Sequence, residues 1–252
     1  MSEDSKINND SPVLEITDLK KSFGNFTVLK DINISIKKGE SVVLLGKSGT
    51  GKSVILQCII GLLYPTHGTI KVFNSDFSTL PEDQKNKIRR RIGFLFQSGA
   101  LYDSMTVRQN LAFPVIRQPD YKKNDLSEKI TETLENVCLA DAIDKMPSEL
   151  SGGMKKRIGL ARTLMLDPEI ILYDEPTTGL DPVTSNEISK LILDMQKKFD
   201  VTSLIVTHDM ACAKLVADRI IVLKDGTIAA AGSYDELAKS DDEFVRGFFE
   251  FE

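Results

Sequence analysis

Three continuous apolar runs dominate the pattern of hydrophobic and polar positions along the chain. They are SVVLLG at 41–46, EIILYDEP at 169–176 and VTSLIVTHD at 201–209. Uninterrupted apolar residues are typical of parallel strands that are buried on both faces, and helical patterns lie between these runs. The pattern therefore predicts an α/β core built on a parallel sheet.

Polar or glycine residues end each of the three runs. The first run ends at Gly46, the second at Asp174 and Glu175, and the third at His208. Ligands of open α/β sheets bind beyond the carboxyl ends of the strands. The sequence therefore predicts that three distant segments contribute to one site.

The remaining segments have other patterns. VLEITDL and FTVLKDINISI alternate in part around a turn at Gly24, which predicts an antiparallel edge region. Residues 98–160 contain helical stretches and three prolines but no strong buried strand, which predicts an inserted helical subdomain. We expect a disordered lead-in at 1–12, one domain at 13–238 and a C-terminal tail at 239–252.

Composition narrows the classes of function. The chain has 252 residues and a net charge of −5, which argues against a general role in binding nucleic acid. Its three cysteines lie far apart and show neither a disulfide framework nor metal-ligand spacing, as expected in a reducing compartment. No run approaches the roughly 18 apolar residues that span a bilayer. We therefore expect any membrane role to come through a partner.

The segment GKSGTGKS fits the phosphate-loop pattern G-x-x-x-x-G-K-[ST], after a strand and before a helix. Glycines let backbone N–H groups surround phosphate oxygens, and the helix N-terminus adds partial positive charge. Lys52 is expected to reach the β- and γ-phosphates, and Ser53 to ligate Mg²⁺. The alternative is a glycine-rich turn that binds nothing. The predicted phosphate-binding residues are Gly46, Lys47, Ser48, Gly49, Thr50, Gly51, Lys52 and Ser53.

Four polar residues at the ends of the strands are candidates for metal binding and catalysis at the phosphate-loop site. Asp174 is expected to hold the metal through water, and Glu175 to orient or deprotonate an attacking water. His208 is placed to contact the γ-phosphate. Gln97, after the fourth apolar run IGFLF, is placed to touch Mg²⁺ and to sense the helical insert. Taken alone, each has a structural interpretation as a strand-end residue, and the phosphate loop favours the functional one.

The segment SGGMKKRIGLAR predicts a second anion-binding helix start. Ser151 is a good N-cap residue, and Gly152 and Gly153 permit close backbone approach to an anion. Lys155, Lys156 and Arg162 lie off the apolar stripe of the helix, so we expect a solvated basic face. Two phosphate-binding helix starts are one too many for a single nucleotide. A dimer in which each chain completes the other's site accounts for both.

Over about residues 13–238, these motifs and their order resemble the ATP-binding-cassette (ABC) ATPases. The resemblance implies a P-loop NTPase fold with a RecA-like core, an antiparallel β subdomain and an inserted α-helical subdomain. It also implies a homodimer that encloses two ATP molecules with Mg²⁺, with Ser151 and Gly153 facing the other chain's γ-phosphate. The matching residues are Phe23 for adenine stacking, Gly46 to Ser53 for Walker A, Gln97 for the Q-loop, LSGGM for the signature, Asp174 for Walker B, Glu175 for the general base, Asp181 for the D-loop and His208 for the switch histidine.

One position departs from the family pattern. Met154 stands where the family usually has glutamine, and methionine offers no amide hydrogen bond. LSGGMKKR and FQSGALYDSMTV together resemble the ATPase of Mla-type systems. That resemblance implies phospholipid transport with a multispan permease and an MCE-domain protein, at the cytoplasmic face of the inner membrane. The alternatives are a single-cassette ABC ATPase that acts in assembly or cell division, and an importer ATPase for another substrate.

The tail carries an apolar stripe of its own. Phe244, Phe248 and Phe251 recur at i, i+4 and i+7. Exposed apolar stripes are costly in water. The stripe therefore predicts either packing on the same chain or docking onto the neighbouring cassette or another small partner.

Overall fold

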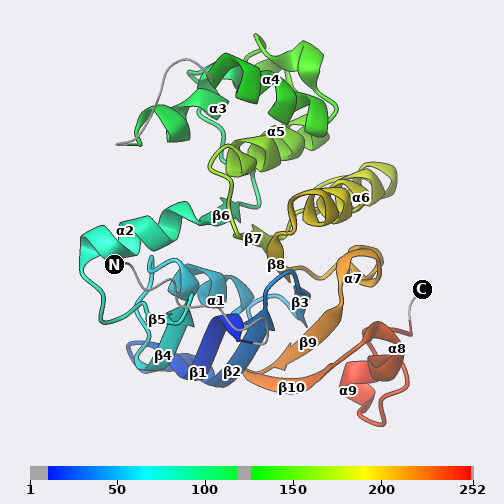
Figure 1. Cartoon of the computed structure of the whole chain (residues 1–252). Helices are drawn as coiled ribbons and strands as arrows, with labels where there is room; N and C mark the ends of the chain where they lie inside the picture. The colour runs from blue at the N-terminus through cyan, green and yellow to red at the C-terminus, as the bar shows by residue number, and fades with distance from the viewer. Residues whose placement is uncertain (1–10, 119–125, 251–252) are drawn as a thin grey trace.

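A computed structural model describes residues 11–118 and 126–250, and its strands form one ten-stranded mixed sheet (Figure 1). The strand order is β5-β4-β1-β2-β10-β9-β3-β8-β7-β6. The strands are β1 (Pro12–Phe23), β2 (Phe26–Lys37), β3 (Ser41–Gly46), β4 (His67–Val72), β5 (Ser75–Asp76), β6 (Ile92–Leu95), β7 (Ile170–Asp174), β8 (Thr202–Val206), β9 (Arg219–Lys224) and β10 (Thr227–Gly232).

Helices cover the sheet and form a separate layer beside it. In the described ranges, no helix combines the length and the hydrophobicity needed to cross a bilayer. The helices are α1 (Lys52–Ile59), α2 (Glu82–Arg90), α3 (Val107–Ile116), α4 (Leu126–Asn136), α5 (Gly152–Leu164), α6 (Pro182–Phe199), α7 (Met210–Val216), α8 (Tyr234–Leu237) and α9 (Glu243–Arg246), with 3-10 turns η2 (Ala140–Ala142) and η3 (Pro147–Glu149).

The predicted parallel core is confirmed. Strands β6, β7, β8, β3 and β9 are parallel neighbours. On β3, Val43 and Leu45 pack into one hydrophobic cluster, whereas Val42 and Leu44 pack into another. Successive side chains of a strand point to opposite faces, so both faces of this sheet are covered. Burial on both faces is the physical reason for the uninterrupted apolar run.

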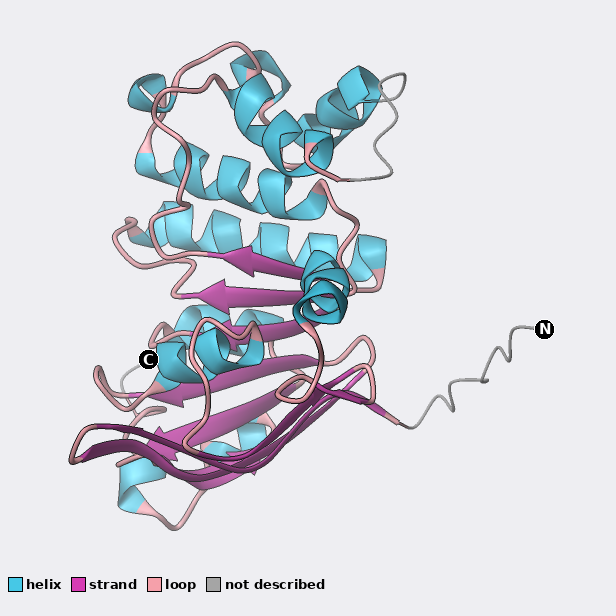
Figure 2. Ribbon diagram, turned by 90° about the vertical axis from the view of Figure 1, so that its left-hand side faces the viewer, coloured by secondary structure: helices cyan, strands magenta, loops and turns pink. Residues whose placement is uncertain are grey.

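The predicted antiparallel region is also present. Strand β1 pairs antiparallel with β2 and β4, and β4 pairs with β5. Gly24 has a φ of 57° in the turn between β1 and β2, a backbone conformation that glycine adopts without a steric cost. Figure 2 shows these long curved strands at the end of the sheet that lies farthest from the helical segment.

The helical segment contains α3, α4 and α5. Thr106 caps α3 in a reciprocal capping box with Gln109, and Ser151 caps α5. Leu111, Leu134 and Ile158 from the three helices share a hydrophobic cluster with one face of the sheet. Helix α5 continues to Leu164, so the helical segment extends beyond the predicted boundary at residue 160.

The predicted ends of the chain need correction. Residues 1–10 of the expected lead-in lie outside the described residues, but Pro12 already begins β1. In the tail, the Phe244 and Phe248 rings are 5.4 Å apart and pack against this chain's own hydrophobic cluster. Phe251 lies outside the described residues. The described part of the tail therefore packs on its own chain.

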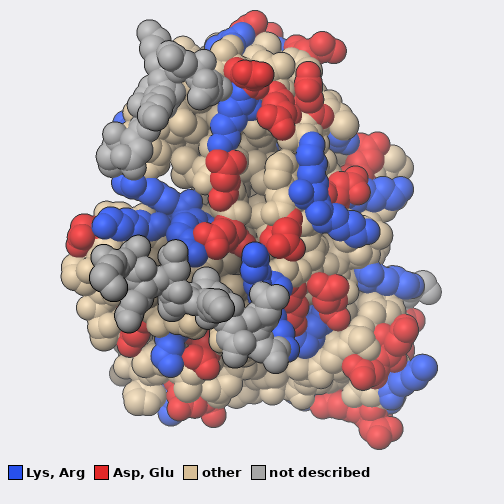
Figure 3. All heavy atoms as spheres, in the orientation of Figure 1, with Lys and Arg blue, Asp and Glu red and all other residues tan. Residues whose placement is uncertain are grey.

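Charged side chains of both signs share the visible surface (Figure 3). Lys and Arg side chains gather over α2, whose last turn carries Lys87, Arg89 and Arg90. Part of this cluster is neutralised, because Arg89 pairs with Glu82 on the same helix. The face that Figure 3 shows therefore carries charges of both signs.

Candidate functional site

The carboxyl ends of the parallel strands meet at one cavity of about 520 Å³. Strand β8 lies between β3 and β7, and both pairings are parallel, so their polar ends share one edge of the sheet. The predicted convergence of Gln97, the phosphate loop, Glu175 and His208 is therefore present. The residues that line the cavity are Val28, Ser48, Gly49, Gly51, Lys52, Ser53, Val54, Gln97, Glu175, Thr178 and His208.

The phosphate loop depends on glycines at defined backbone angles. Gly49 has a φ of 82° and Gly51 a φ of 97°, both in the left-handed region. A Cβ atom on Gly51 would lie 2.6 Å from a methyl group of Leu29, so a side chain there would also collide with β2. The loop turns tightly into α1, whose N-terminal N–H groups are available to an anion.

Lys52 lies at the centre of this loop. Its side chain is 7% exposed, and its Nζ atom donates to the Gly46 carbonyl at 2.7 Å and to the Lys47 carbonyl at 3.2 Å. Burial lowers the pKa of Lys52, while Glu175 and Asp174 act in the opposite direction. The carbonyls aim the ammonium group within the loop, where it can meet a phosphate group.

Ser53 and Asp174 form the candidate Mg²⁺ site. The Ser53 hydroxyl donates to Asp174 Oδ1 at 2.7 Å, and Gln97 lines the same cavity as Ser53. These groups offer a hydroxyl, a carboxylate and an amide oxygen, and Mg²⁺ prefers such donors when phosphates and waters complete its octahedron. The donor set therefore fits Mg²⁺. No group of three or more His, Cys, Asp or Glu residues suited to a metal occurs in the described part of the chain.

Burial destabilises the ionised form of Asp174. Burial raises its pKa above the usual 3.8; the Ser53 hydrogen bond opposes the rise and nearby Glu175 adds to it. A raised folded-state pKa means that the folded protein holds this proton more tightly than the unfolded chain. The associated stability is present below pH 3.8 and is lost as pH rises through the higher folded-state value.

Asp174→Asn is therefore expected to raise the Tm of the nucleotide-free protein at pH 7 by on the order of 1–3 °C. The difference in Tm should shrink as the pH falls through the raised folded-state pKa of Asp174, where the carboxyl gains its proton. Differential scanning calorimetry across this range measures both effects. The control is Asp144→Asn, at an exposed carboxylate that pairs with Arg108. A lower Tm for Asp174→Asn at pH 7 would contradict the sign of the effect.

Glu175 is held by contacts on every side. Its Oε2 atom lies 2.8 Å from His208 Nδ1 and accepts from the Thr178 hydroxyl at 3.0 Å. Its Oε1 atom lies 3.9 Å from Lys52 Nζ, and its side chain is only 14% exposed. A fixed carboxylate at the edge of a phosphate cavity suits a general base that accepts a proton from water. Sequence reasoning did not identify Thr178.

The predicted second anion-binding segment lies apart from this cavity. Ser151 caps α5 by accepting from the Met154 N–H at 3.3 Å, and Asp181 caps α6. A Cβ atom on Gly153 would lie 2.5 Å from Thr184 on α6, so the two helix starts pack together. Among the described residues that line the cavity, Ser151, Gly152, Gly153 and Asp181 do not occur. One chain therefore presents the two halves at separate places.

Phe23, the predicted adenine-stacking residue, is not among the described residues that line this cavity. Phe23 is 47% exposed, and the Lys21 ammonium group lies 4.9 Å from its ring centroid. Its register partner Phe26 lines an adjoining cavity of about 380 Å³, which also includes Lys47 and Phe244. The sequence did not indicate that Phe26 and Phe244 line a cavity beside the phosphate loop. The tail stripe that contains Phe244 was the available signal.

The basic face predicted on α5 is wrong for Lys156 and Arg162. Lys156 is 5% exposed, and its Nζ atom donates to the Glu175 carbonyl at 3.0 Å. Arg162 donates to the Ala100 carbonyl at 2.7 Å. Burial lowers the pKa of Lys156, while Glu175 and Asp174 oppose this effect. The loops after β6 and β7 cover this side of α5, which helix periodicity alone cannot show.

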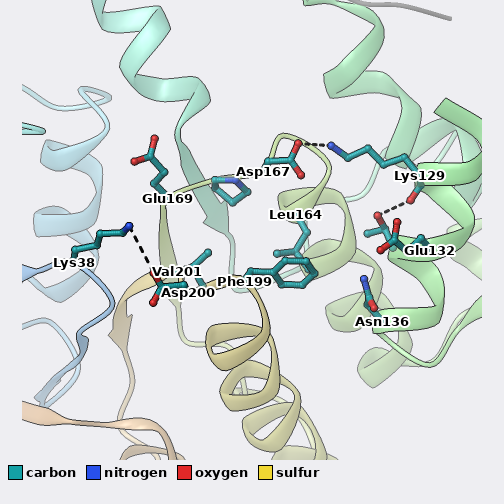
Figure 4. Close-up of a pocket in the computed structure, with 12 residues that line it drawn as sticks. Lys38, Lys129, Glu132, Asn136, Leu164, Asp167, Glu169, Phe199, Asp200 and Val201 are labelled. Carbon is teal, nitrogen blue, oxygen red and sulfur yellow. Dashed lines mark hydrogen bonds and ion pairs between the residues drawn. The ribbon is translucent and has the colours of Figure 1, made fainter. Parts of the chain in front are cut away.

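A cavity of about 400 Å³ lies at the opposite, amino ends of the parallel strands (Figure 4). It is lined by Glu169 and Val201, which precede β7 and β8, and by residues of α4 and α6. Figure 4 shows Lys38 directed at Asp200 and Lys129 directed at Asp167, as ion pairs. These lysines already have carboxylate partners, so the cavity lacks the free cationic character of a phosphate site.

Comparisons with known proteins support the nucleotide-binding site that the geometry indicates. Residues 29–178 match the profile of the family described as ABC transporter. The chain is 43% identical over 235 residues to the probable ribonucleotide transport ATP-binding protein mkl of Mycobacterium leprae, which covers 93% of this chain and 68% of that protein. It is 39% identical over 259 residues to the chloroplastic protein TRIGALACTOSYLDIACYLGLYCEROL 3 of Arabidopsis thaliana, which covers 96% of this chain and 75% of that protein.

The chain is also similar in structure to a cassette that was solved as a dimer. The ATP-binding cassette MJ0796, solved as a dimer in a post-hydrolysis state with ADP and Pi, matches with a TM-score of 0.79 and 33% identity. The match covers 87% of this chain and 98% of that one.

Proposed function

Because the chain belongs to the ABC transporter family and is the ATP-hydrolysing subunit of a transporter, we propose that a homodimer of this chain drives a multispan permease. In this proposal the permease moves phospholipid together with an MCE-domain protein. In this proposal the chain lies peripherally at the cytoplasmic face of the inner membrane. Residues 13–238 form the ATPase domain, with the helical segment inserted. The hydrogen-bonded cluster of Ser53, Asp174, Glu175 and His208 beside Lys52 carries the catalytic part of the proposal.

In this proposal each residue of the site has a separate role in ATP hydrolysis. The phosphate loop and Lys52 bind the β- and γ-phosphates, and Phe23 stacks on the adenine. Ser53, Asp174 and Gln97 would hold Mg²⁺, which neutralises phosphate charge when bound. Glu175 orients the attacking water and accepts its proton, while His208, whose Nδ1 atom lies beside Glu175, would offer Nε2 to the γ-phosphate. Catalysis then consists mostly of positioning and electrostatic stabilisation.

The signature segment lies apart from the cavity of its own chain, and a dimer would bring it to the cavity of the partner chain. Ser151, Gly152 and Gly153 of one chain would meet the γ-phosphate bound by the partner chain, next to Asp181. Hydrolysis removes the γ-phosphate that holds the two chains together, so the dimer reopens. Gln97 lines the cavity and precedes the helical segment in the chain, so it would pass this motion to the permease.

The assignment to phospholipid rests on a small number of residues. Met154 replaces the usual amide side chain and packs against the hydrophobic cluster instead. One relative bears the name of a galactolipid, which supports a lipid substrate, whereas the mycobacterial relative's name points to ribonucleotides. An importer ATPase for another substrate is therefore the second candidate. A single-cassette ATPase in assembly or cell division is the third.

Affinity purification from detergent-solubilised membranes tests the proposal. The full chain carries a removable tag, and Lys52→Ala is purified in parallel as a version impaired in ATP binding. We expect a multispan permease and an MCE-domain protein in the complex, together with bound phospholipid by mass spectrometry. A permease without the MCE-domain protein or phospholipid would favour the importer. Recovery of non-membrane partners alone would favour the third candidate.

A further inference from the structure

Lys156 is a buried cation that the phosphate chemistry does not use. It lies on α5, within the segment that follows the signature residues, and only 5% of its surface is exposed. Its Nζ atom donates to the backbone carbonyl of Glu175 at 3.0 Å. A buried ammonium group needs a partner to offset the loss of hydration. The partner here is the main chain of the proposed general base.

The backbone of Glu175 has an unusual conformation. Its φ is 50°, in the left-handed region that residues other than glycine rarely adopt. Such a conformation persists only where neighbouring contacts hold it. The Glu175 N–H donates to the Val206 carbonyl at 2.8 Å, so β8 holds the peptide unit that precedes the Glu175 Cα atom. The following peptide unit is held through the Glu175 carbonyl, which accepts from Lys156 Nζ at 3.0 Å and from the Thr178 N–H at 3.3 Å.

Helix α5 is well placed to provide rigid support. Near its end, Arg162 donates to the Ala100 carbonyl in the segment that follows Gln97. At its start, Gly153 packs against Thr184 on α6. The helix therefore contacts the Gln97 segment, the Glu175 peptide and α6. The Lys156 side chain therefore extends from a helix that contacts all three.

We infer that Lys156 is a positioning residue, which holds the Glu175 backbone in its left-handed conformation and thereby aims the carboxylate at the attacking water. The inference rests on the proposed role of Glu175 as general base. In this role Lys156 acts through the Glu175 backbone rather than on the phosphate or the attacking water. Loss of its hydrogen bond should therefore slow turnover without weakening ATP binding.

The test compares lysine-to-methionine substitutions on one helix. Lys156→Met keeps an unbranched side chain of similar length and removes the donor. We expect kcat to fall roughly 10- to 100-fold, because small misplacements of catalytic groups cost this much. The Kd for ATP should stay within about twofold, since the phosphate loop is unchanged. Lys155→Met, at the preceding and half-buried position, should keep normal turnover.

A second set of variants separates positioning from general damage. Lys156→Arg retains a donor and is expected to turn over faster than Lys156→Met; equal impairment of both would contradict the inference. In single-turnover assays, adding Lys156→Met to Glu175→Gln should cost less than about twofold, because the carboxylate that it aims is already gone. A full multiplicative loss would also overturn the inference. Normal turnover of Glu175→Gln alone would instead reject the general base, which is a distinguishable failure.

Discussion

Replacing Glu175 with glutamine is expected to lower ATP turnover roughly 10²- to 10⁴-fold, the range that a general base contributes. Glutamine keeps the size of the side chain and can still accept from Thr178, so the cavity should keep its shape. The amide cannot take a proton from water. ATP binding should persist because the phosphate loop and Lys52 are untouched, and steady-state phosphate release measures the loss.

The same variant is expected to accumulate closed dimers when ATP is present. The γ-phosphate that holds the two chains together is no longer removed, so light scattering should report a stable dimer with ATP and a return to monomer after ATP is withdrawn. Glu15→Gln is the matched control, because the Glu15 carboxylate forms an exposed ion pair with Lys71. Near-normal turnover in Glu175→Gln would refute the catalytic assignment.

The sequence was sufficient for features that depend on local pattern. The run at β3 is apolar from Val42 to Leu45 because successive side chains face opposite clusters, and this requirement can be read from the sequence alone. The phosphate loop is similarly local, since its glycines are required by backbone angles within a single turn. The position of the site followed from topology, because parallel strands bring their carboxyl ends to one edge.

Features that depend on packing between distant segments could not be predicted in this way. Lys156 lies off the apolar stripe of α5, a position that normally indicates solvent. Its burial depends on the loop at Glu175, which is 19 residues away in sequence. The left-handed φ of Glu175 is equally hidden, because glutamate has no preference for that conformation. The tail was ambiguous for the same reason, as a stripe of phenylalanines does not specify what covers it.

Lys52→Ala is expected to weaken ATP binding by roughly 10- to 100-fold, because a charge-assisted hydrogen bond contributes about 1.5–3 kcal/mol. The variant also leaves Asp174 and Glu175 without the nearby Lys52 charge that offsets them. Phosphate groups would then meet a more negative cavity. Titration with a fluorescent ATP analogue measures the change in Kd, and unlabelled ATP, ADP and AMP compete against it.

The control for this variant is Lys38→Ala, an exposed lysine that pairs with Asp200 at the opposite end of the sheet. Its Kd for ATP should match that of the unaltered protein. The loss caused by Lys52→Ala should grow from AMP to ADP to ATP, because Lys52 is expected to reach the β- and γ-phosphates. An equal loss for all three nucleotides would indicate a general distortion of the loop. An unchanged Kd for ATP would contradict the phosphate-binding role of Lys52, and with it the hydrolytic site built around this loop.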